Sequence, residues 1–204
     1  MKAVLISIQP KWVEKICHKI GELNGTPIYK KRIEVRKGKP KERLPIKCFI
    51  YETYDKKYDG IGVCWGQGNI FEHACKKVIG EFVCDRIDRI CKRGINNNFD
   101  YCYLSLNEWG NDDIEIEITD IQKSCISKRE LNAYGANSSC LYAWHITDLK
   151  IYDKPKELRE FKKPCDRFLD CITCKRLVRN DFLSCDNKIT RPPQSYMFVE
   201  ELQE

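Results

Sequence analysis

Short runs in which apolar and polar residues alternate, separated by turn residues, dominate this chain of 204 residues. Such runs are typical of β-strands, because successive side chains of a strand point to opposite faces. They cover residues 2–8, 30–37, 47–53, 78–87, 114–118, 141–146, 147–152 and 196–199. Many short strands with few helices predict an α+β chain built on a small mixed β-barrel.

Two stretches have helical character and are expected to flank the barrel. The first begins at Pro10, which suits the first position of a helix. Its apolar residues recur at helical spacing through about residue 20, namely Trp12, Val13, Ile16 and Ile20. In the second, Ser127 precedes Glu130 by three residues, the spacing of a capping box for a short helix that ends near Gly135. Residues 54–76 and 94–111 are predicted loops.

The strand after the first helix carries an unusual set of charges. Ile33 and Val35 point to one face, so Arg32, Glu34 and Arg36 share the other. Most alternating charged strands are solvated edges. The alternative is a carboxylate held between two cations beside a pocket.

Charge and composition limit the cellular context. The net charge is +6, and residues 1–60 hold 15 Lys and Arg against 7 Asp and Glu, which suits a polyanion-binding surface. Residues 100–120 hold seven acids and no base, so this segment could instead neutralise the basic part. No apolar run approaches the ~20 residues of a membrane span. Thirteen cysteines without an export signal favour a cytoplasmic location.

Four of the cysteines lie within 21 residues and include one C-x-x-C pair: Cys165, Cys171, Cys174 and Cys185. Thiolates at this spacing suit a structural, tetrahedral zinc ion. Incidental cysteines in a polar loop, or a redox pair, are the alternatives. The domain prediction is a barrel of residues 1–161 and 189–204 with a zinc-binding insertion at 162–188. Cys64, His73 and Cys75 are more simply explained as loop residues than as a second metal site.

Several motifs occur together in order. Lys31-x-x-Glu34-x-Arg36 is followed by residues 77–85, 142–158 and 191–201, which include Tyr-Ala-Trp-His-Ile and Arg-Pro-Pro-Gln-Ser. Together they resemble the ASCH family, in particular the group common in phages and prophages. The resemblance covers nearly the whole chain except residues 55–76, 92–115 and 162–188, which look like insertions.

The resemblance implies a PUA-like β-barrel that binds RNA or nucleotides in a cleft beside the K-x-x-E-x-R strand. One branch of the family hydrolyses acetylcytidine, and nuclease activity is described for others. In the amidohydrolase branch a lysine, a threonine and a distant glutamate form the site. The lysine matches Lys31 and the glutamate is matched to Glu130, but Glu34 occupies the threonine position, so the hydroxyl group is missing.

The first functional hypothesis is a module that binds RNA or a modified nucleotide. Lys31 and Arg36 would hold a phosphate or carbonyl oxygen, and an aromatic residue would stack on a base. Trp144 is assigned to the core. The predicted ligand-binding residues are Arg36, Arg32, Tyr142 and His145.

The second hypothesis is a hydrolase acting on a nucleoside or RNA. Glu34 would be the general acid or base and Lys31 would stabilise the oxyanion, assisted by Glu130 or His145. A histidine in an apolar strand is more often a core residue, however. The third hypothesis is a phage-related interaction protein that docks a protein partner through its zinc lobe.

Overall fold

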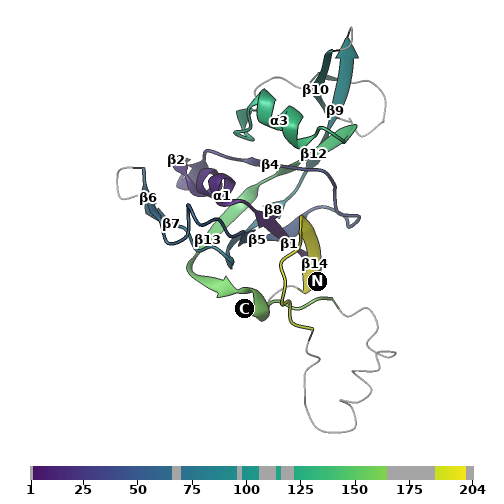
Figure 1. Ribbon diagram of the computed structural model, residues 1–204. Helices are drawn as coiled ribbons and strands as arrows, with labels where there is room; N and C mark the ends of the chain where they lie inside the picture. The colour runs from purple at the N-terminus through teal and green to yellow at the C-terminus, as the bar shows by residue number, and fades with distance from the viewer. Residues whose placement is uncertain are drawn as a thin grey trace, which may run out of the picture.

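The computed structural model describes residues 2–65, 70–95, 98–105, 114–115, 122–164 and 187–200. Two five-stranded sheets form its framework (Figure 1). The strands of the first sheet are, in spatial order, β13 (Thr147–Glu157), β8 (Lys77–Cys84), β5 (Ile46–Glu52), β1 (Lys2–Ile8) and β14 (Tyr196–Glu200). The strands of the second are β11 (Ile114–Glu115), β10 (Asn98–Ser105), β9 (Ile87–Ile95), β12 (Cys140–His145) and β4 (Ile33–Arg36). Only β1 and β5 pair in parallel among these strands, so the first sheet is mixed.

The two sheets continue into each other through one bent pair of strands. Two residues separate β8 from β9, and Ile146 alone separates β12 from β13. Because β8 pairs with β13 while β9 pairs with β12, the same two chain segments belong to both sheets. The bend encloses a core that includes the fully buried Trp144, as predicted. The expected α+β class, a small mixed β-barrel with short flanking helices, is confirmed.

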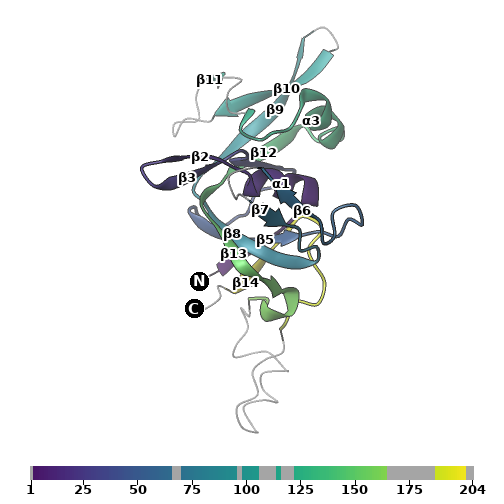
Figure 2. The same cartoon turned by 90° about the vertical axis from the view of Figure 1, so that its left-hand side faces the viewer.

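The remaining described elements are short. They are α1 (Pro10–Cys17), α3 (Lys128–Tyr134), the 3₁₀ helix η1 (Leu158–Glu160), and the hairpins β2 (Lys19–Leu23) with β3 (Thr26–Tyr29) and β6 (Gly62–Cys64) with β7 (Ile70–Glu72). Figure 2 shows the β2–β3 and β6–β7 hairpins projecting on opposite sides of the molecule. Helix α1 lies beside β1 and β4, and α3 lies close to β9, β10 and β12 (Figures 1 and 2).

The first helix is shorter than predicted. It ends at Cys17, and Ile20 lies in β2 with 57% of its surface exposed. The reason is the next turn, where Asn24 and Gly25 both adopt positive φ angles of 51° and 78°. An Asn-Gly pair in this conformation closes a tight β-hairpin, so pairing with β3 recruits residues 19–23 into a strand.

The two predicted loops also contain strands, which corrects the sequence interpretation. Residues 54–76 include the β6–β7 hairpin, and residues 94–111 include the whole of β10, which pairs with β9. Their mixed composition hid the pairing, because a strand that projects from the core needs few buried apolar residues.

The predicted insertion leaves and re-enters the barrel at adjacent points. Lys162 and Lys188 form an antiparallel bridge, and the Ile189 N–H donates to the Phe161 carbonyl oxygen at 2.9 Å. Phe161 and Ile189 are both fully buried. Residues 165–186 lie outside the described residues, and the domain boundaries stay a prediction.

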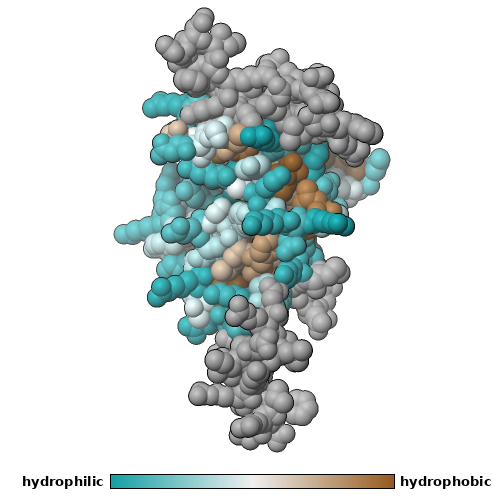
Figure 3. Space-filling view, turned by 90° about the vertical axis from the view of Figure 1, so that its right-hand side faces the viewer, coloured by the Kyte–Doolittle hydropathy of each residue, from teal (hydrophilic) through white to brown (hydrophobic). Residues whose placement is uncertain are grey.

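The described surface is largely polar. Figure 3 shows one face on which hydrophilic side chains surround smaller hydrophobic areas. Within the ranges given above, no helix has the length and apolar character required to cross a membrane.

Candidate nucleotide-binding site

A cavity of about 450 Å³ lies where α1, β4 and α3 meet. The residues that line it come from segments far apart in the chain. They are Ser7 of β1; Gln9, Lys11 and Trp12 at α1; Glu34, Val35 and Arg36 of β4; Thr53 directly after β5; Ile126, Glu130, Ala133 and Tyr134 at α3; and Gln194 and Ser195 before β14. Its volume is within the range of small-molecule sites, ~300–1,000 Å³. The charged strand singled out in the sequence therefore borders a cavity.

Glu34 lies between two cations at this cavity. Arg36 Nη2 is 3.0 Å from Glu34 Oε1, and Lys31 Nζ is 3.2 Å from Glu34 Oε2. Backbone carbonyl groups hold both cations from behind. Arg36 Nη2 donates to the Ser7 oxygen at 2.6 Å, and Lys31 Nζ donates to the Ser124 oxygen at 2.6 Å. Glu34 and its two cations thus form a buried network that ties β4 to β1 and to the turn before α3, and Lys31, not Arg32, is the second cation.

Burial makes this network energetically demanding. The exposed fractions of Lys31, Glu34 and Arg36 are 0%, 5% and 6%. Burial lowers the pKa of Lys31, and the neighbouring carboxylate of Glu34 opposes that shift. The Arg36 Nε atom is buried and has no hydrogen-bond partner among the described residues. Buried charges of this kind are kept only when their partners compensate the lost hydration, so the three side chains act as one unit.

Aromatic rings and ammonium groups form the rim. Three ammonium groups lie near the centroid of the Trp12 ring, those of Lys11 at 4.4 Å, Lys15 at 4.7 Å and Lys31 at 5.0 Å. The Nζ atom of Lys37 lies 5.3 Å from the centroid of the Tyr134 ring. Cations combined with aromatic faces are the features that proteins use to hold bases and phosphates of single-stranded nucleic acids.

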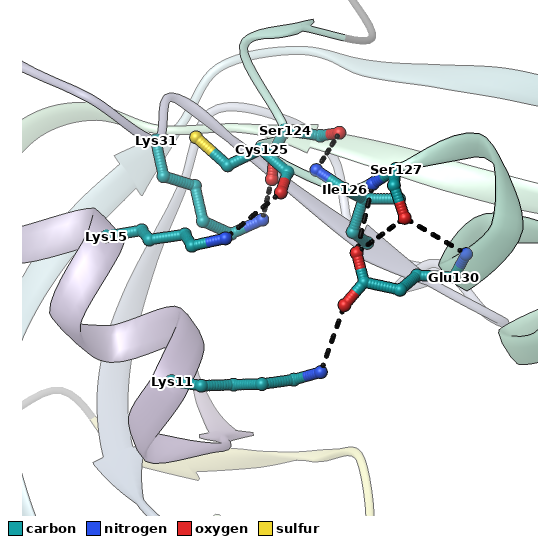
Figure 4. A network of polar contacts seen from close by, with 8 residues as sticks. All are labelled: Lys11, Lys15, Lys31, Ser124, Cys125, Ile126, Ser127 and Glu130. Carbon is teal, nitrogen blue, oxygen red and sulfur yellow. Dashed lines mark hydrogen bonds and ion pairs between the residues drawn. The ribbon is translucent and has the colours of Figure 1, made fainter.

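Glu130 caps α3 and also forms an ion pair with Lys11 of α1 at the cavity. Its backbone and side chain complete the predicted capping box with Ser127, and α3 ends with Gly135 as its C-cap, so this prediction is confirmed. Hydrogen bonds from Ser127, with a smaller contribution from Lys11, lower the pKa of Glu130 to about 2. The Lys11 ammonium lies 3.3 Å from Glu130 Oε1 (Figure 4). A carboxylate with so low a pKa is a weak proton acceptor at neutral pH.

The low pKa of Glu130 predicts a pH dependence of folding stability. Because its folded-state pKa of about 2 is below the ordinary value of 4.5, its contribution is complete above pH 4.5 and is lost as the pH falls toward 2. The measurement is the free energy of unfolding at pH 6 and pH 3. Wild type should lose more stability than Glu130→Gln over this interval. An equal loss in both proteins would contradict the assignment.

The other three predicted ligand-binding residues do not line the cavity. The Arg32 side chain is exposed at the residue before β4. Tyr142 pairs with Arg36 across the strands, but its ring packs against the core cluster that includes Trp144. His145 lies at the bend between the sheets, where its Nε2 atom is 2.8 Å from Asp88 Oδ2. The structure thus brings together Lys31, Glu34, Arg36 and Glu130, and places these three elsewhere.

The rim residues Lys11, Trp12 and Tyr134 were not predicted as site residues. Trp12 fits the apolar periodicity of α1, which points to the core, and a single lysine beside it gives no further signal. Gln194 and Ser195 were quoted only as part of the Arg-Pro-Pro-Gln-Ser motif. These five residues are recognised as site residues only because the fold brings them to the same cavity.

The predicted zinc ligands Cys165, Cys171, Cys174 and Cys185 lie outside the described residues, so the zinc ion stays a prediction. In the part of the chain that the structure describes, no group of three or more His, Cys, Asp or Glu residues is placed to hold a metal ion. His73 instead contacts Glu52, with 2.5 Å between Nδ1 and Oε1, and both side chains are fully buried.

Solved structures similar to this chain include the ASCH protein of Zymomonas mobilis and two single-substitution variants of it. The TM-scores are 0.49, 0.48 and 0.48, each at 16% sequence identity. The matches cover 98% of this chain and 88%, 92% and 89% of the other chains. No protein-family model matches the chain, and neither does any curated protein. Membership of the ASCH family therefore stays a prediction from the sequence motifs.

Proposed function

We propose that this protein binds RNA or a modified nucleotide by holding one nucleoside unit in the cavity beside Lys31, Glu34 and Arg36. The observation that carries the proposal is the buried ion network at a cavity of about 450 Å³ with aromatic residues at its rim. An isolated buried network would be a structural feature alone. Here Glu34 and Arg36 also line a space of suitable volume for a ligand.

The charged pair matches the chemistry of a base edge. A guanidinium group only donates hydrogen bonds, and an ionised carboxylate only accepts them. Arg36 and Glu34 therefore offer a donor beside an acceptor, and the edges of nucleobases also place donors beside acceptors. Trp12 and Tyr134 supply ring surface at the same cavity for contact with the face of a base.

A hydrolase acting on a modified nucleoside or RNA is the second candidate. Hydroxyl groups are present after all, because Ser7, Thr53 and Ser195 line the cavity. The Ser7 hydroxyl, however, donates to the Pro193 oxygen at 2.7 Å. Both oxygens of Glu34 are already engaged in ion pairs. The pKa of Glu130 is about 2, so this carboxylate is poorly suited to accept a proton. These contacts favour binding over hydrolysis.

Titration calorimetry with the four common ribonucleosides and their 5′-monophosphates tests the proposal. We expect wild type to bind at least one of them, and Tyr134→Ala to bind it about tenfold more weakly, because stacking contributes about 1–3 kcal/mol per base. Tyr54→Ala is the matched control, since Tyr54 is exposed, does not line the cavity and also lies under a lysine, Lys76. Failure of all eight compounds to bind, or equal losses in the two variants, would contradict the proposal.

A further inference from the structure

We infer that Lys11 binds the phosphate group of the ligand, and that it exchanges its ion pair with Glu130 for that phosphate. This inference rests on the proposed function and defines the ligand more closely, as a phosphate-bearing nucleotide and not a neutral nucleoside. Lys11 extends from α1 and Glu130 from α3, and the two side chains meet at the cavity that both line (Figure 4).

The ion pair between Lys11 and Glu130 is of the kind that breaks easily. Its two atoms are 3.3 Å apart, and the side chains are 43% and 44% exposed. Exposed pairs of this type contribute little to stability, since water and salt compete for both partners. A ligand that offers Lys11 a more highly charged acceptor can therefore displace Glu130.

Glu130 keeps its other partners when Lys11 leaves. Its Oε2 atom accepts hydrogen bonds from the Ser127 N–H at 3.1 Å and from the Ser127 hydroxyl at 2.8 Å, whereas Lys11 contacts only Oε1. The bonds from Ser127 are also the main reason for the low pKa of this carboxylate. Glu130 thus stays ionised and fixed to the start of α3 without the lysine.

Further cations lie close to the cavity, in addition to those that line it. The four charged lining residues balance one another, since Lys11 pairs with Glu130 and Arg36 with Glu34. Lys31 shares Glu34 with Arg36. Lys15 instead donates to the backbone oxygen of Cys125 at 3.3 Å, which is a neutral acceptor (Figure 4). A phosphate monoester, which carries about −1.5 to −2 at pH 7, would offer Lys11 and Lys15 a more highly charged acceptor than either has now.

The positions of Lys11 and Lys15 beside Trp12 also favour a ligand with a phosphate group. The ammonium groups of Lys11 and Lys15 lie 4.4 Å and 4.7 Å from the centroid of the Trp12 ring. A nucleotide whose base contacts the aromatic rim would bring its phosphate toward these two groups, while Arg36 and Glu34 remain available for the base. A neutral nucleoside would form no ion pair with either ammonium group.

The test compares three ligands with the same base: the nucleoside, its 5′-monophosphate and a dinucleoside monophosphate. Wild type should bind at least one phosphate-bearing ligand about tenfold more tightly than the nucleoside, and whichever is preferred identifies the monoester or the diester as the natural group. Lys11→Gln should abolish this preference by weakening the phosphate-bearing ligand about tenfold more than the nucleoside. Glu130→Gln should raise affinity for the phosphate-bearing ligand severalfold, because it removes the competing charge while glutamine preserves the capping box.

Lys156→Gln is the control, since Lys156, like Lys11, lies over an aromatic ring, at 4.9 Å from the centroid of Tyr152, but does not line the cavity. It should change none of the three affinities. Equal binding of all three ligands by wild type would overturn the phosphate site and leave the proposed function intact. Equal weakening of nucleoside and nucleotide by Lys11→Gln would also overturn it, since Lys11 would then only support the cavity. Failure of every ligand to bind would reject the proposed function itself.

Discussion

Glu34→Ala is expected to lower the free energy of unfolding by about 3–5 kcal/mol, the usual effect of removing one partner from a buried ion pair. The substitution removes the carboxylate that lies 3.2 Å from the ammonium of Lys31 and 3.0 Å from the guanidinium of Arg36, and leaves both cations buried. Lys31 is fully buried and Arg36, although it borders the cavity, is only 6% exposed, so water can compensate little of either charge. Urea denaturation at pH 7 measures the change.

The control for this experiment is Glu42→Ala. Glu42 forms an ion pair with Lys2 at 3.9 Å, but the two side chains are 43% and 44% exposed. The control should lose less than about 1 kcal/mol. If the two variants lost similar amounts, the network of Lys31, Glu34 and Arg36 would be hydrated and not buried, and its role in shaping the cavity would be wrong.

Arg36→Lys is expected to weaken nucleotide binding at least about tenfold while the protein remains folded. Lysine keeps the positive charge, but its single ammonium replaces a planar group with five N–H donors. Arg36 Nη2 already serves both Glu34 Oε1 and the Ser7 oxygen, so a lysine that maintains these bonds has little capacity left for a ligand. Calorimetric titration measures the affinity, and circular dichroism checks the fold.

Arg159→Lys is the matched control for Arg36→Lys. Arg159 is exposed in η1 and does not line the cavity, so its replacement should leave the affinity unchanged. Wild-type affinity in Arg36→Lys would show that charge alone matters at this position, and the donor-beside-acceptor recognition of a base edge would have to be abandoned.

The charged strand could be predicted because its information is local. A period of two places Glu34 and Arg36 on one face, whatever the rest of the chain does. The same rule placed Arg32 with them, but Arg32 precedes β4 and its side chain is exposed. Alternation gives the face of a residue and not its depth, which depends on the elements that pack above it.

The rest of the site depends on contacts between distant segments. Lys11, Glu34 and Glu130 come from α1, β4 and α3, and no local pattern indicates that they meet. For Tyr142 and His145 the sequence predicted a role in the site that the structure does not support. Both lie on β12, the strand beside β4, but neither lines the cavity. The end of α1 was misplaced for a similar reason, since the Asn24–Gly25 turn decides where Ile20 belongs.

A crystal structure of the protein with the tightest-binding nucleotide tests the central claim most directly. The account predicts the base in the cavity between α1 and α3, with hydrogen bonds to Glu34 and Arg36 and ring contact with Trp12 or Tyr134. It also predicts the phosphate at Lys11, with Glu130 still bonded to Ser127. A nucleotide bound elsewhere, such as beside Tyr142 and His145 with this cavity vacant, would contradict the account.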